Sequence, residues 1–444
     1  MLNYFKEKEF SSAQILAIGY FVVIFTGTIL LMTPWATTAT GSMDFINALF
    51  TSTSATCVTG LIVVNTSTAF TVFGQIVILA LIQIGGLGIM TMSSLIAMVL
   101  GRKIGFKERL LIKDDLDHLR FSGLVRLVRH VLTFTFVIEG VGALILFIRL
   151  IWDYPFLRAL YLAIFHTISA FNNAGFDIFG NSLENFTGDV VINLVIMSLI
   201  ILGGLGFAVI AELYNNKKLK KFTLQSKMVL LFTVILLVIG FFGFFLLEYN
   251  NGATLGNLPL GEKALASLFL SVTPRTAGFN TVPTGELYSS TLFFVIILMF
   301  IGASPGSTGG GIKTTTFGVL IMTIWNLITG KNDIEVFKRR LDKRIVYKAI
   351  VITMLSLGLV IFVTMVLAIT EGKEFMPILF ETVSAFGTVG LSTGITSSLS
   401  YLGRALIIFT MFVGRVGPLT LAIALAEKKQ KGVYHYPKEN VTVG

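Results

Sequence analysis

Long apolar runs recur along the chain, and more polar segments separate them. Runs longer than about 18 residues predict helices that span a membrane. Eight such runs occur, at residues 13–33, 70–100, 128–151, 190–213, 228–247, 291–327 with an interruption, 345–369 and 402–426. The first run exceeds the apolar core of a signal peptide, which has about 7–15 residues, so we interpret it as a retained helix.

Two kinds of connection alternate between these runs. One kind is basic and covers residues 102–129, 217–227 and 331–348, together with the start and the tail of the chain. The other kind, at 34–69, 152–189, 248–290 and 370–401, carries few Lys or Arg residues. Lys and Arg gather on the cytoplasmic side of membrane proteins. The pattern therefore predicts a multi-pass protein of the plasma (inner) membrane with both termini in the cytoplasm.

The less basic connections contain short apolar pieces, such as residues 45–55 and 161–170. Pieces of about 10–14 residues are too short to span a bilayer and suit re-entrant helices. Aligned on a Leu/Ile-Phe pair, all four connections share a hydroxyl residue four positions after the Phe and a glycine nine or ten positions after it. The Phe residues are Phe50, Phe165, Phe269 and Phe380, the hydroxyl residues are Ser54, Ser169, Thr273 and Ser384, and the glycines are Gly60, Gly175, Gly278 and Gly390.

This recurrence predicts an all-α membrane protein of four parallel helix–pore loop–helix repeats around a pseudo-fourfold pore. The expected copies are residues 1–105, 106–220, 221–335, whose second helix is broken, and 336–444, which includes the tail. The glycine-rich stretches that begin at Gly85, Gly203 and Gly414 lie in the second helices, where small residues favour close helix packing.

The loops before the four glycines are candidates for binding a cation. Non-helical backbone inside a membrane must line protein or water, and rings of carbonyl groups replace the water shell of an ion of potassium's size. The candidate residues are Thr56, Cys57, Val58, Thr59, Gly60, Asn172, Asn173, Ala174, Gly175, Arg275, Thr276, Ala277, Gly278, Gly387, Thr388, Val389 and Gly390. We expect Arg275 to point away from the ion and to pair with a carboxylate. Glu139 and Glu248 are expected near helix ends, at the membrane interface.

The second helix of the third copy contains a segment that should unwind, because it combines Pro305 with many glycines. The candidate gate residues in this loop are Gly302, Ala303, Ser304, Gly306, Gly309, Gly310, Gly311 and Lys313. Arg415 lies deep in the last apolar run, where a charge is costly and usually faces a polar interior. We expect Arg415 to donate to free carbonyls of this loop and to act as a positive barrier near the pore.

Composition supports the membrane class, since 54% of the residues are hydrophobic and only 13% are charged. A single Cys excludes a disulfide framework and a thiolate zinc site. The net charge of +10 is explained by the basic connections and does not indicate nucleic acid.

Three alternatives bear on these motifs. Residues 306–314 nearly match the Walker pattern, but Ile312 separates the Gly from the Lys. A proton-coupled or non-selective cation transporter remains open, although inverted repeats would place basic connections on both sides. A metal site at residues 114–118 competes with a solvated acidic face.

The four loops ending in Gly, the Gly/Ser-rich break in the third copy and Arg415 together resemble the Trk/Ktr/HKT superfamily of potassium transporters. The likeness covers nearly the whole chain and is greatest to the membrane subunit of a bacterial Ktr system. It implies that Gly60, Gly175, Gly278 and Gly390 are filter glycines and that Gly in all four loops favours potassium.

The resemblance further implies that residues 302–313 form an intramembrane gating loop and that Arg415 is the gate arginine. It implies a homodimer on a cytoplasmic ring of nucleotide-binding subunits, with K⁺ as the transported ion and uptake stimulated by Na⁺. No enzymatic activity is expected. The tail at 428–444 is expected at a subunit or partner interface. The third loop is one residue shorter than the others, so the sequence leaves its register open.

Overall fold

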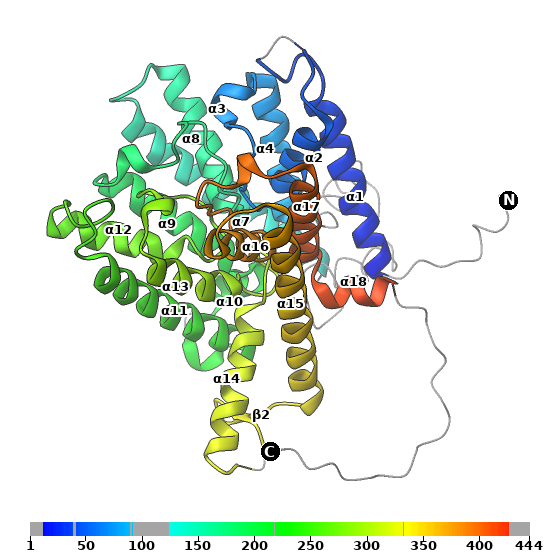
Figure 1. Cartoon of the computed structure of the whole chain (residues 1–444). Coiled ribbons are helices and arrows are strands. Elements are labelled where there is room, and N and C mark those ends of the chain that lie inside the picture. The colour runs from blue at the N-terminus through cyan, green and yellow to red at the C-terminus, as the bar shows by residue number, and fades with distance from the viewer. Residues whose placement is uncertain are drawn as a thin grey trace, which may run out of the picture.

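The computed structural model describes residues 12–38, 41–88, 91, 124–216, 218–331 and 333–425 (Figure 1). These residues are largely helical, with one small hairpin in which β1 (Glu335–Val336) pairs antiparallel with β2 (Arg339–Arg340). The acidic stretch at 114–118 and the tail at 428–444 lie outside the described residues.

The first helix of each expected copy is continuous. These helices are α1 (Ser12–Leu31), α7 (Leu124–Leu150), α11 (Leu224–Glu248) and α15 (Lys343–Thr370). In the described part of the chain they are the four single helices long and apolar enough to cross a membrane. Many of their large side chains face outward, including Phe21, Phe242 and Phe362, which are 55–63% exposed. Such side chains suit contact with lipid, where exposed apolar surface has no cost.

The second helix is interrupted in the second, third and fourth copies. α4 (Val72–Leu87) ends at Gly88, and most of the rest of the run at 70–100 lies outside the described residues. The other pairs are α9 (Val190–Leu205) with α10 (Phe207–Asn215), α13 (Ser289–Phe300) with α14 (Thr314–Ile328), and α17 (Tyr401–Val416) with α18 (Pro418–Leu425). The predicted break in the third copy is confirmed.

Two of the predicted spans were wrong as continuous helices. The run at 190–213 bends by 98° between α9 and α10, and the run at 402–426 breaks between α17 and α18. Gly206 and Gly417, at the two breaks, both have φ 94°. Glycine adopts this conformation without the Cβ clash that other residues meet, so it ends the helix.

The four predicted re-entrant pieces form short helices, α2 (Phe45–Thr56), α8 (Phe156–Phe171), α12 (Leu260–Val272) and α16 (Phe375–Gly387). Pro155 and Pro259 precede α8 and α12, where a missing N–H has no cost. The less basic connections, which we call the outer connections, add α3 (Thr66–Ala69), η1 (Glu184–Phe186), η3 (Thr284–Glu286) and η4 (Thr396–Ser398). η2 (Leu219–Lys221) precedes α11.

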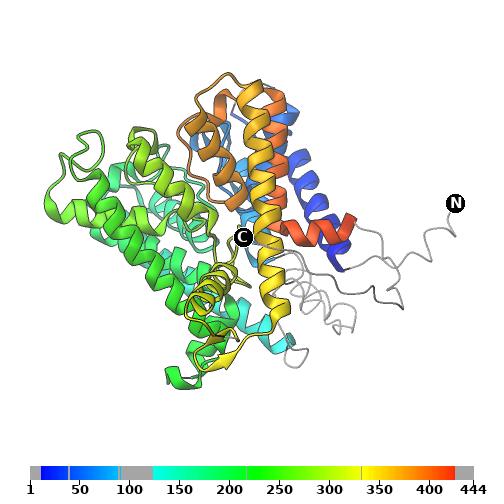
Figure 2. The same ribbon diagram turned by 60° about the horizontal axis from the view of Figure 1, so that its bottom comes forward.

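The helices pack in an order that returns to its start. Within a copy, the first helix packs on the short helix, as in α1 on α2 and α7 on α8. Between copies, each second helix packs on the next short helix: α4 on α8, α9 on α12, α13 on α16, and α17 back on α2. The short helices therefore end in the middle of the molecule. In Figure 2 the long α15, in gold, stands upright beside the orange helices of the fourth copy.

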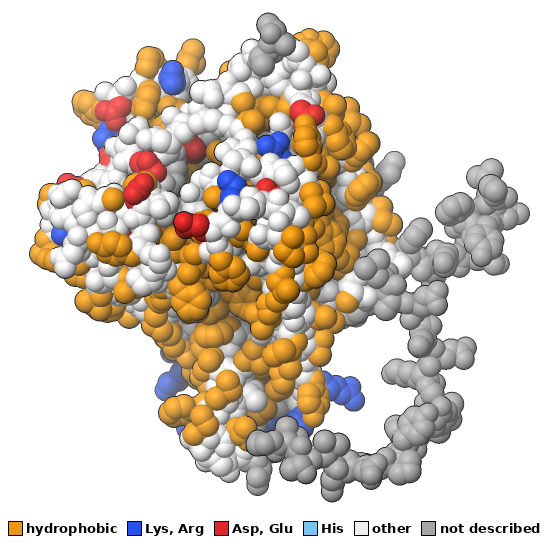
Figure 3. All heavy atoms as spheres, viewed as in Figure 1, with side chains coloured by type: hydrophobic (Ala, Val, Ile, Leu, Met, Phe, Trp, Pro, Cys, Tyr) orange, Lys and Arg blue, Asp and Glu red, His pale blue; other side chains and the backbone are white. Residues whose placement is uncertain are grey.

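The surface separates by type of side chain. Figure 3 shows hydrophobic side chains over most of the visible flank, with Asp and Glu only in its upper part and Lys and Arg also at its lower end. The lower end carries the hairpin and the start of α15, whose Lys343 and Arg344 are exposed. The apolar flank matches the outward-facing residues of the long helices.

Candidate functional site

The site is formed by four central loops, residues 56–60, 172–175, 275–278 and 387–390, which follow the ends of the short helices. In each loop the residue before the glycine donates its N–H to the carbonyl of the recurring hydroxyl residue. These bonds join Thr59 to Ser54 at 2.8 Å, Ala174 to Ser169 at 2.8 Å, Ala277 to Thr273 at 3.0 Å and Val389 to Ser384 at 2.9 Å. The third loop reaches the same contact with one residue fewer, which settles its register on Gly278.

The side chains of the four hydroxyl residues also hold the loops. Ser54 Oγ accepts from the Gly60 N–H and Ser384 Oγ accepts from the Gly390 N–H, both at 3.1 Å. In the other two copies, Ser169 donates to the Phe176 carbonyl and Thr273 donates to the Phe279 carbonyl. The recurring hydroxyl group in the sequence therefore has a common role, which is to fix each loop to its own short helix.

The loop backbone is strained at equivalent positions. The residue two before each glycine has a positive φ: 58° at Val58, 59° at Asn173, 67° at Thr276 and 49° at Thr388. A β-branched residue in this region is rare and costs on the order of 1–3 kcal/mol, which the surrounding structure must offset. Such strain is typical of backbone that is held for a functional purpose.

The four glycines lie against one another in a closed order, and we call them the glycine ring. A β-carbon added to Gly60 would lie 2.5 Å from the Ala174 carbonyl oxygen, and one added to Gly175 would lie 2.8 Å from the Ala277 oxygen. One added to Gly278 would lie 2.6 Å from the Val389 oxygen, and one on Gly390 would overlap the Thr59 oxygen. The ring leaves no room for a side chain, and it brings four carbonyl oxygens together.

Asn172, predicted as a loop residue, directs its side chain away from the glycine ring. Its Nδ2 donates to Gln83 Oε1 at 2.9 Å and to Glu139 Oε1 at 3.2 Å. The expectation that Glu139 lies at a helix end was wrong, because it lies within α7 and is 7% exposed. Its carboxylate is instead an acceptor in a buried polar cluster behind the second loop. Glu248 does end α11, where it accepts from the Tyr288 N–H at 3.0 Å.

Arg275 also points away from the glycine ring, as expected, but the predicted carboxylate partner was wrong. Its guanidinium donates to the Thr233 carbonyl at 3.4 Å and to Thr233 Oγ1 at 3.2 Å. No ion pair involving Arg275 occurs within the described residues. The charge is buried beside α11, where backbone and hydroxyl oxygens solvate it in place of an anion.

The loop between α13 and α14, residues 301–313, crosses beneath the central loops, and we call it the intramembrane loop. Its backbone bonds to the breaks of two other copies: Ser304 N–H to Gly204 O at 3.0 Å, Thr308 N–H to Gly203 O at 3.2 Å and Gly311 N–H to Gly414 O at 3.3 Å. The Phe207 N–H donates in turn to Gly306 O at 2.9 Å. The Walker-like residues lie here between two helices, not after a strand.

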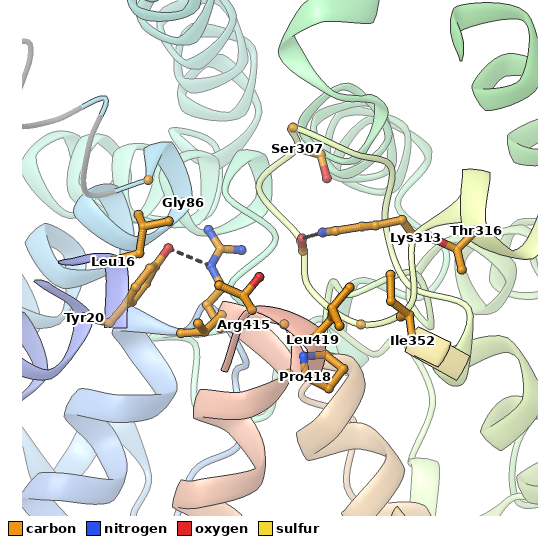
Figure 4. A pocket seen from close by; sticks show the side chains of 18 of the residues that line it. Leu16, Tyr20, Gly86, Ser307, Lys313, Thr316, Ile352, Arg415, Pro418 and Leu419 are labelled. Atoms are coloured by element: carbon orange, nitrogen blue, oxygen red, sulfur yellow. Dashed lines mark hydrogen bonds between the residues drawn. The ribbon is translucent and has the colours of Figure 1, made fainter. Parts of the chain in front are cut away.

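Arg415 joins the intramembrane loop to the first copy. Its guanidinium donates to the Thr308 carbonyl, as predicted, and also to the Gly85 carbonyl. Nε contacts Tyr20 Oη at 3.3 Å, and Figure 4 shows the two side chains facing one another. Lys313 Nζ donates to Gly309 O at 2.8 Å within the loop. The loop is therefore attached to elements of all the other copies.

A cavity of about 290 Å³ opens beside these residues (Figure 4). Its lining includes Lys313, Lys348 and Arg415, and none of the described residues that line it carries a carboxylate. The described part of the lining therefore carries positive charge, and we call this space the positive cavity.

Carboxyl groups lie on the other side of the glycine ring, in the outer connection of the second copy. Burial raises the pKa of Asp177, against the N–H groups of Gly180, Ser182 and Phe179 that stabilise its charged form. Burial likewise raises the pKa of Glu184, and the Asp177 charge adds to this, although Asn280 donates to Glu184 at 2.7 Å. These groups make that side of the glycine ring acidic.

Several residues of the site were missed from the sequence. Tyr20, Gln83 and Thr233 lie in apolar runs, and each bonds to a predicted residue of the site. The available signal was a polar group inside a predicted span, which is costly unless it has a partner. The packing role predicted for Gly85, Gly203 and Gly414 is confirmed, because a β-carbon at each would overlap the last carbonyl groups of a short helix.

Comparison with known proteins places these features in a family. The family model TrkH, described as "Cation transport protein", matches residues 6–435. The Ktr system potassium uptake protein B of Bacillus subtilis is 46% identical over 98% of this chain and 97% of its own length. The potassium/sodium uptake protein NtpJ of Enterococcus hirae is 38% identical over 98% of both chains.

The fold has a match among solved structures. The crystal structure of the potassium transporter TrkH from Vibrio parahaemolyticus superposes with a TM-score of 0.75 at 19% identity, covering 95% of this chain and 86% of that one. The curated relatives are named as transport proteins and not as enzymes. This chain therefore belongs to the TrkH family of cation transport proteins and is similar to potassium uptake proteins of Ktr systems.

Proposed function

We propose that this protein takes up potassium across the plasma membrane through a selectivity filter formed by the four central loops. In this proposal the copies at 1–105, 106–220, 221–335 and 336–444 are parallel repeats around a pseudo-fourfold pore. The observation that carries it is the glycine ring, in which the carbonyl oxygens of Thr59, Ala174, Ala277 and Val389 lie beside the glycines of neighbouring copies. Rings of carbonyl oxygens replace the hydration shell of potassium.

The short helices support the same pathway. α2, α8, α12 and α16 all end at the central loops. The C-terminus of a helix carries roughly half a negative charge. Four such ends favour a cation at the glycine ring, and the acidic groups in the outer connection of the second copy favour its approach from that side.

The intramembrane loop is the proposed gate. It lies between the glycine ring and the positive cavity, and in this structure Arg415 bonds to its Thr308 carbonyl. A loop held this way obstructs the pathway, and the charges of Arg415, Lys313 and Lys348 repel a cation below it. Uptake requires the loop to move and Arg415 to release it.

Control of this gate is proposed to come from a cytoplasmic ring of nucleotide-binding subunits on which two copies of this chain rest as a homodimer. The support is the similarity to subunits named for Ktr systems. With both termini in the cytoplasm, the basic hairpin at 335–340 lies on the side of that partner. Stimulation by sodium follows from the same resemblance.

Tracer uptake tests this function. The purified chain in proteoliposomes should take up rubidium, with strong competition by potassium and weak competition by sodium. Equal competition would favour the alternative of a non-selective cation transporter, which the relative named as a potassium/sodium uptake protein brings into consideration. Uptake that depends on an imposed pH gradient would favour proton coupling. If the pathway is open and no rubidium is taken up, the result would contradict the proposed filter.

A further inference from the structure

The strained residues of the central loops contact the intramembrane loop in register. The amide of Asn173 lies 3.1 Å from Thr308 Oγ1 in either of its two orientations. Gly310 donates its N–H to Thr388 Oγ1 at 3.0 Å. Between them, a β-carbon on Gly309 would overlap Thr276 Oγ1. Three successive loop residues therefore meet three residues that occupy the same position in copies two, three and four.

The first copy lacks this contact for a chemical reason. Its equivalent residue is Val58, which has φ 58° but no polar atom on its side chain. The intramembrane loop is tied to this copy from the other direction, since Arg415 bonds both Thr308 and Gly85. The two attachments are thus separate: polar side chains of the central loops above, and the arginine below.

All the groups in the upper attachment are buried, and Asn173, Thr276, Thr308 and Thr388 are 0% exposed. A buried hydroxyl or amide that loses its partner keeps its desolvation cost unless water or an ion replaces that partner. The intramembrane loop cannot leave without breaking the bonds to Thr388 and Asn173. The same movement exposes the Thr388 hydroxyl at the inner end of the central loops, where a permeating cation can take the place of the Gly310 N–H.

We propose that Thr388, with Thr276 and Asn173, positions both the gate and the filter, so that closure of the intramembrane loop and the inner end of the selectivity filter depend on the same side chains. This proposal rests on the proposed function, because it assigns further residues to the same pathway. It predicts that loss of the Thr388 hydroxyl loosens the gate and changes ion preference in one step.

Thr388→Val is the test variant, since valine keeps the β-branched shape and the backbone strain at φ 49° but lacks the hydroxyl. Thr388→Ser is the conservative variant, because it retains the hydroxyl that Thr388→Val removes. Thr382→Val is the matched control, because it also removes a buried hydroxyl. Thr382 lies in α16, just before Thr388, and its hydroxyl bonds at 2.9 Å to Ile378 O within the same helix. Rubidium uptake and the sodium-to-potassium competition ratio are measured in proteoliposomes without the cytoplasmic subunit.

We expect Thr388→Val to raise subunit-independent uptake several-fold and to shift the competition ratio toward sodium, and we expect Thr388→Ser and Thr382→Val to stay near wild type. If Thr388→Val fails to fold, Thr308→Val, which removes the hydroxyl facing Asn173, should raise uptake in the same way. A folded Thr388→Val or Thr308→Val protein with wild-type uptake and competition would overturn the inference alone. A wild-type protein without potassium-selective uptake would instead overturn the proposed function.

Discussion

The glycines of the central loops are required for two separate reasons, backbone conformation and space. Gly60 and Gly390 have φ 90° and 91°, which L side chains rarely adopt. A β-carbon at either would also meet a carbonyl group of the neighbouring copy. Conformational strain alone is common in loops, whereas the close approach to another copy is specific to the glycine ring.

A pair of substitutions separates these two causes. Gly394 in the outer connection of the fourth copy has φ 96°, but a β-carbon there would have nothing within 4 Å. Gly60→Ser and Gly394→Ser therefore share the backbone strain, and only the first disturbs the glycine ring. We expect Gly60→Ser to let sodium compete several-fold better for rubidium uptake and Gly394→Ser to leave selectivity unchanged. An unchanged competition ratio in folded Gly60→Ser would remove Gly60 from the filter.

The buried cluster around Glu139 gives a prediction for stability. Glu139→Ala removes the acceptor for Gln83 Nε2 at 3.4 Å and for Asn172 Nδ2 at 3.2 Å. Asn172 Nδ2 keeps its bonds to Gln83 Oε1 and Ile168 O, but Gln83 Nε2 loses this acceptor. A buried donor left without a partner costs about 1–3 kcal/mol, so the alanine variant should unfold at a lower temperature in detergent. Glu139→Gln keeps an acceptor and should lose less. Glu286→Ala, at an exposed position, is the control, and an equal loss for all three variants would contradict the cluster.

Single residues also show where sequence reasoning stops. The hydroxyl and glycine of each loop could be found because they recur at fixed spacing along the chain. The partner of Arg275 could not, since Thr233 is 42 positions away and carries no charge that would mark it. Glu139 was misplaced because its partners Gln83 and Asn172 come from other elements, which hydropathy along one helix does not reveal.

At the scale of the elements, the intramembrane loop stands out because its backbone bonds to two other copies. Backbone without helical bonds is tolerated in a membrane only where protein or water satisfies it. Here the carbonyls of Gly203, Gly204 and Gly414 do so, and each belongs to the interrupted second helix of another copy. The breaks and the loop therefore depend on one another.

Shortening this loop should open the pathway. A deletion within residues 306–311 removes bonds to α9, α17 and the central loops, so we expect subunit-independent rubidium uptake to rise several-fold. Deleting Phe337 and Lys338, at the exposed turn of the hairpin, changes chain length outside the pathway and is the control. Flux that stays at the wild-type level after the loop deletion would count against a gate.

Some elements could be predicted from the sequence and others could not. The four long first helices and the four short helices follow from apolar length alone, and the break in the third copy follows from Pro305 and its glycines. The breaks at Gly206 and Gly417 could not be predicted, because a glycine in an apolar run is compatible with either close helix packing or a helix end. At Gly206 the contact with Pro305 of the intramembrane loop decides between them. Near Gly417 the loop bonds to Gly414 instead, and both contacts come from residues about 100 positions away in the sequence.

At the scale of the whole molecule, cysteine labelling can test the proposed orientation in the membrane. Cys57 is the only cysteine and is fully buried, so the wild-type protein should not react with a membrane-impermeant maleimide. Gly261→Cys in an outer connection introduces a β-carbon with nothing within 4 Å, and it should be labelled on intact cells. Lys338→Cys on the hairpin should be labelled only after permeabilisation. The opposite pattern would reverse the topology.

The return of α17 onto α2 has a consequence for how the protein is made. The contacts that complete the ring join distant parts of the chain: Arg404 reaches Asn47 at 2.6 Å across 357 positions, and Gly390 meets Thr59. A ribosome releases the first copy long before the fourth exists. A partly synthesised chain therefore lacks a complete ring of helices around the pathway. A truncated product also lacks the contacts that Arg404 and Gly390 make with the first copy. The proposed filter and the proposed gate are therefore complete only when the last copy has entered the membrane.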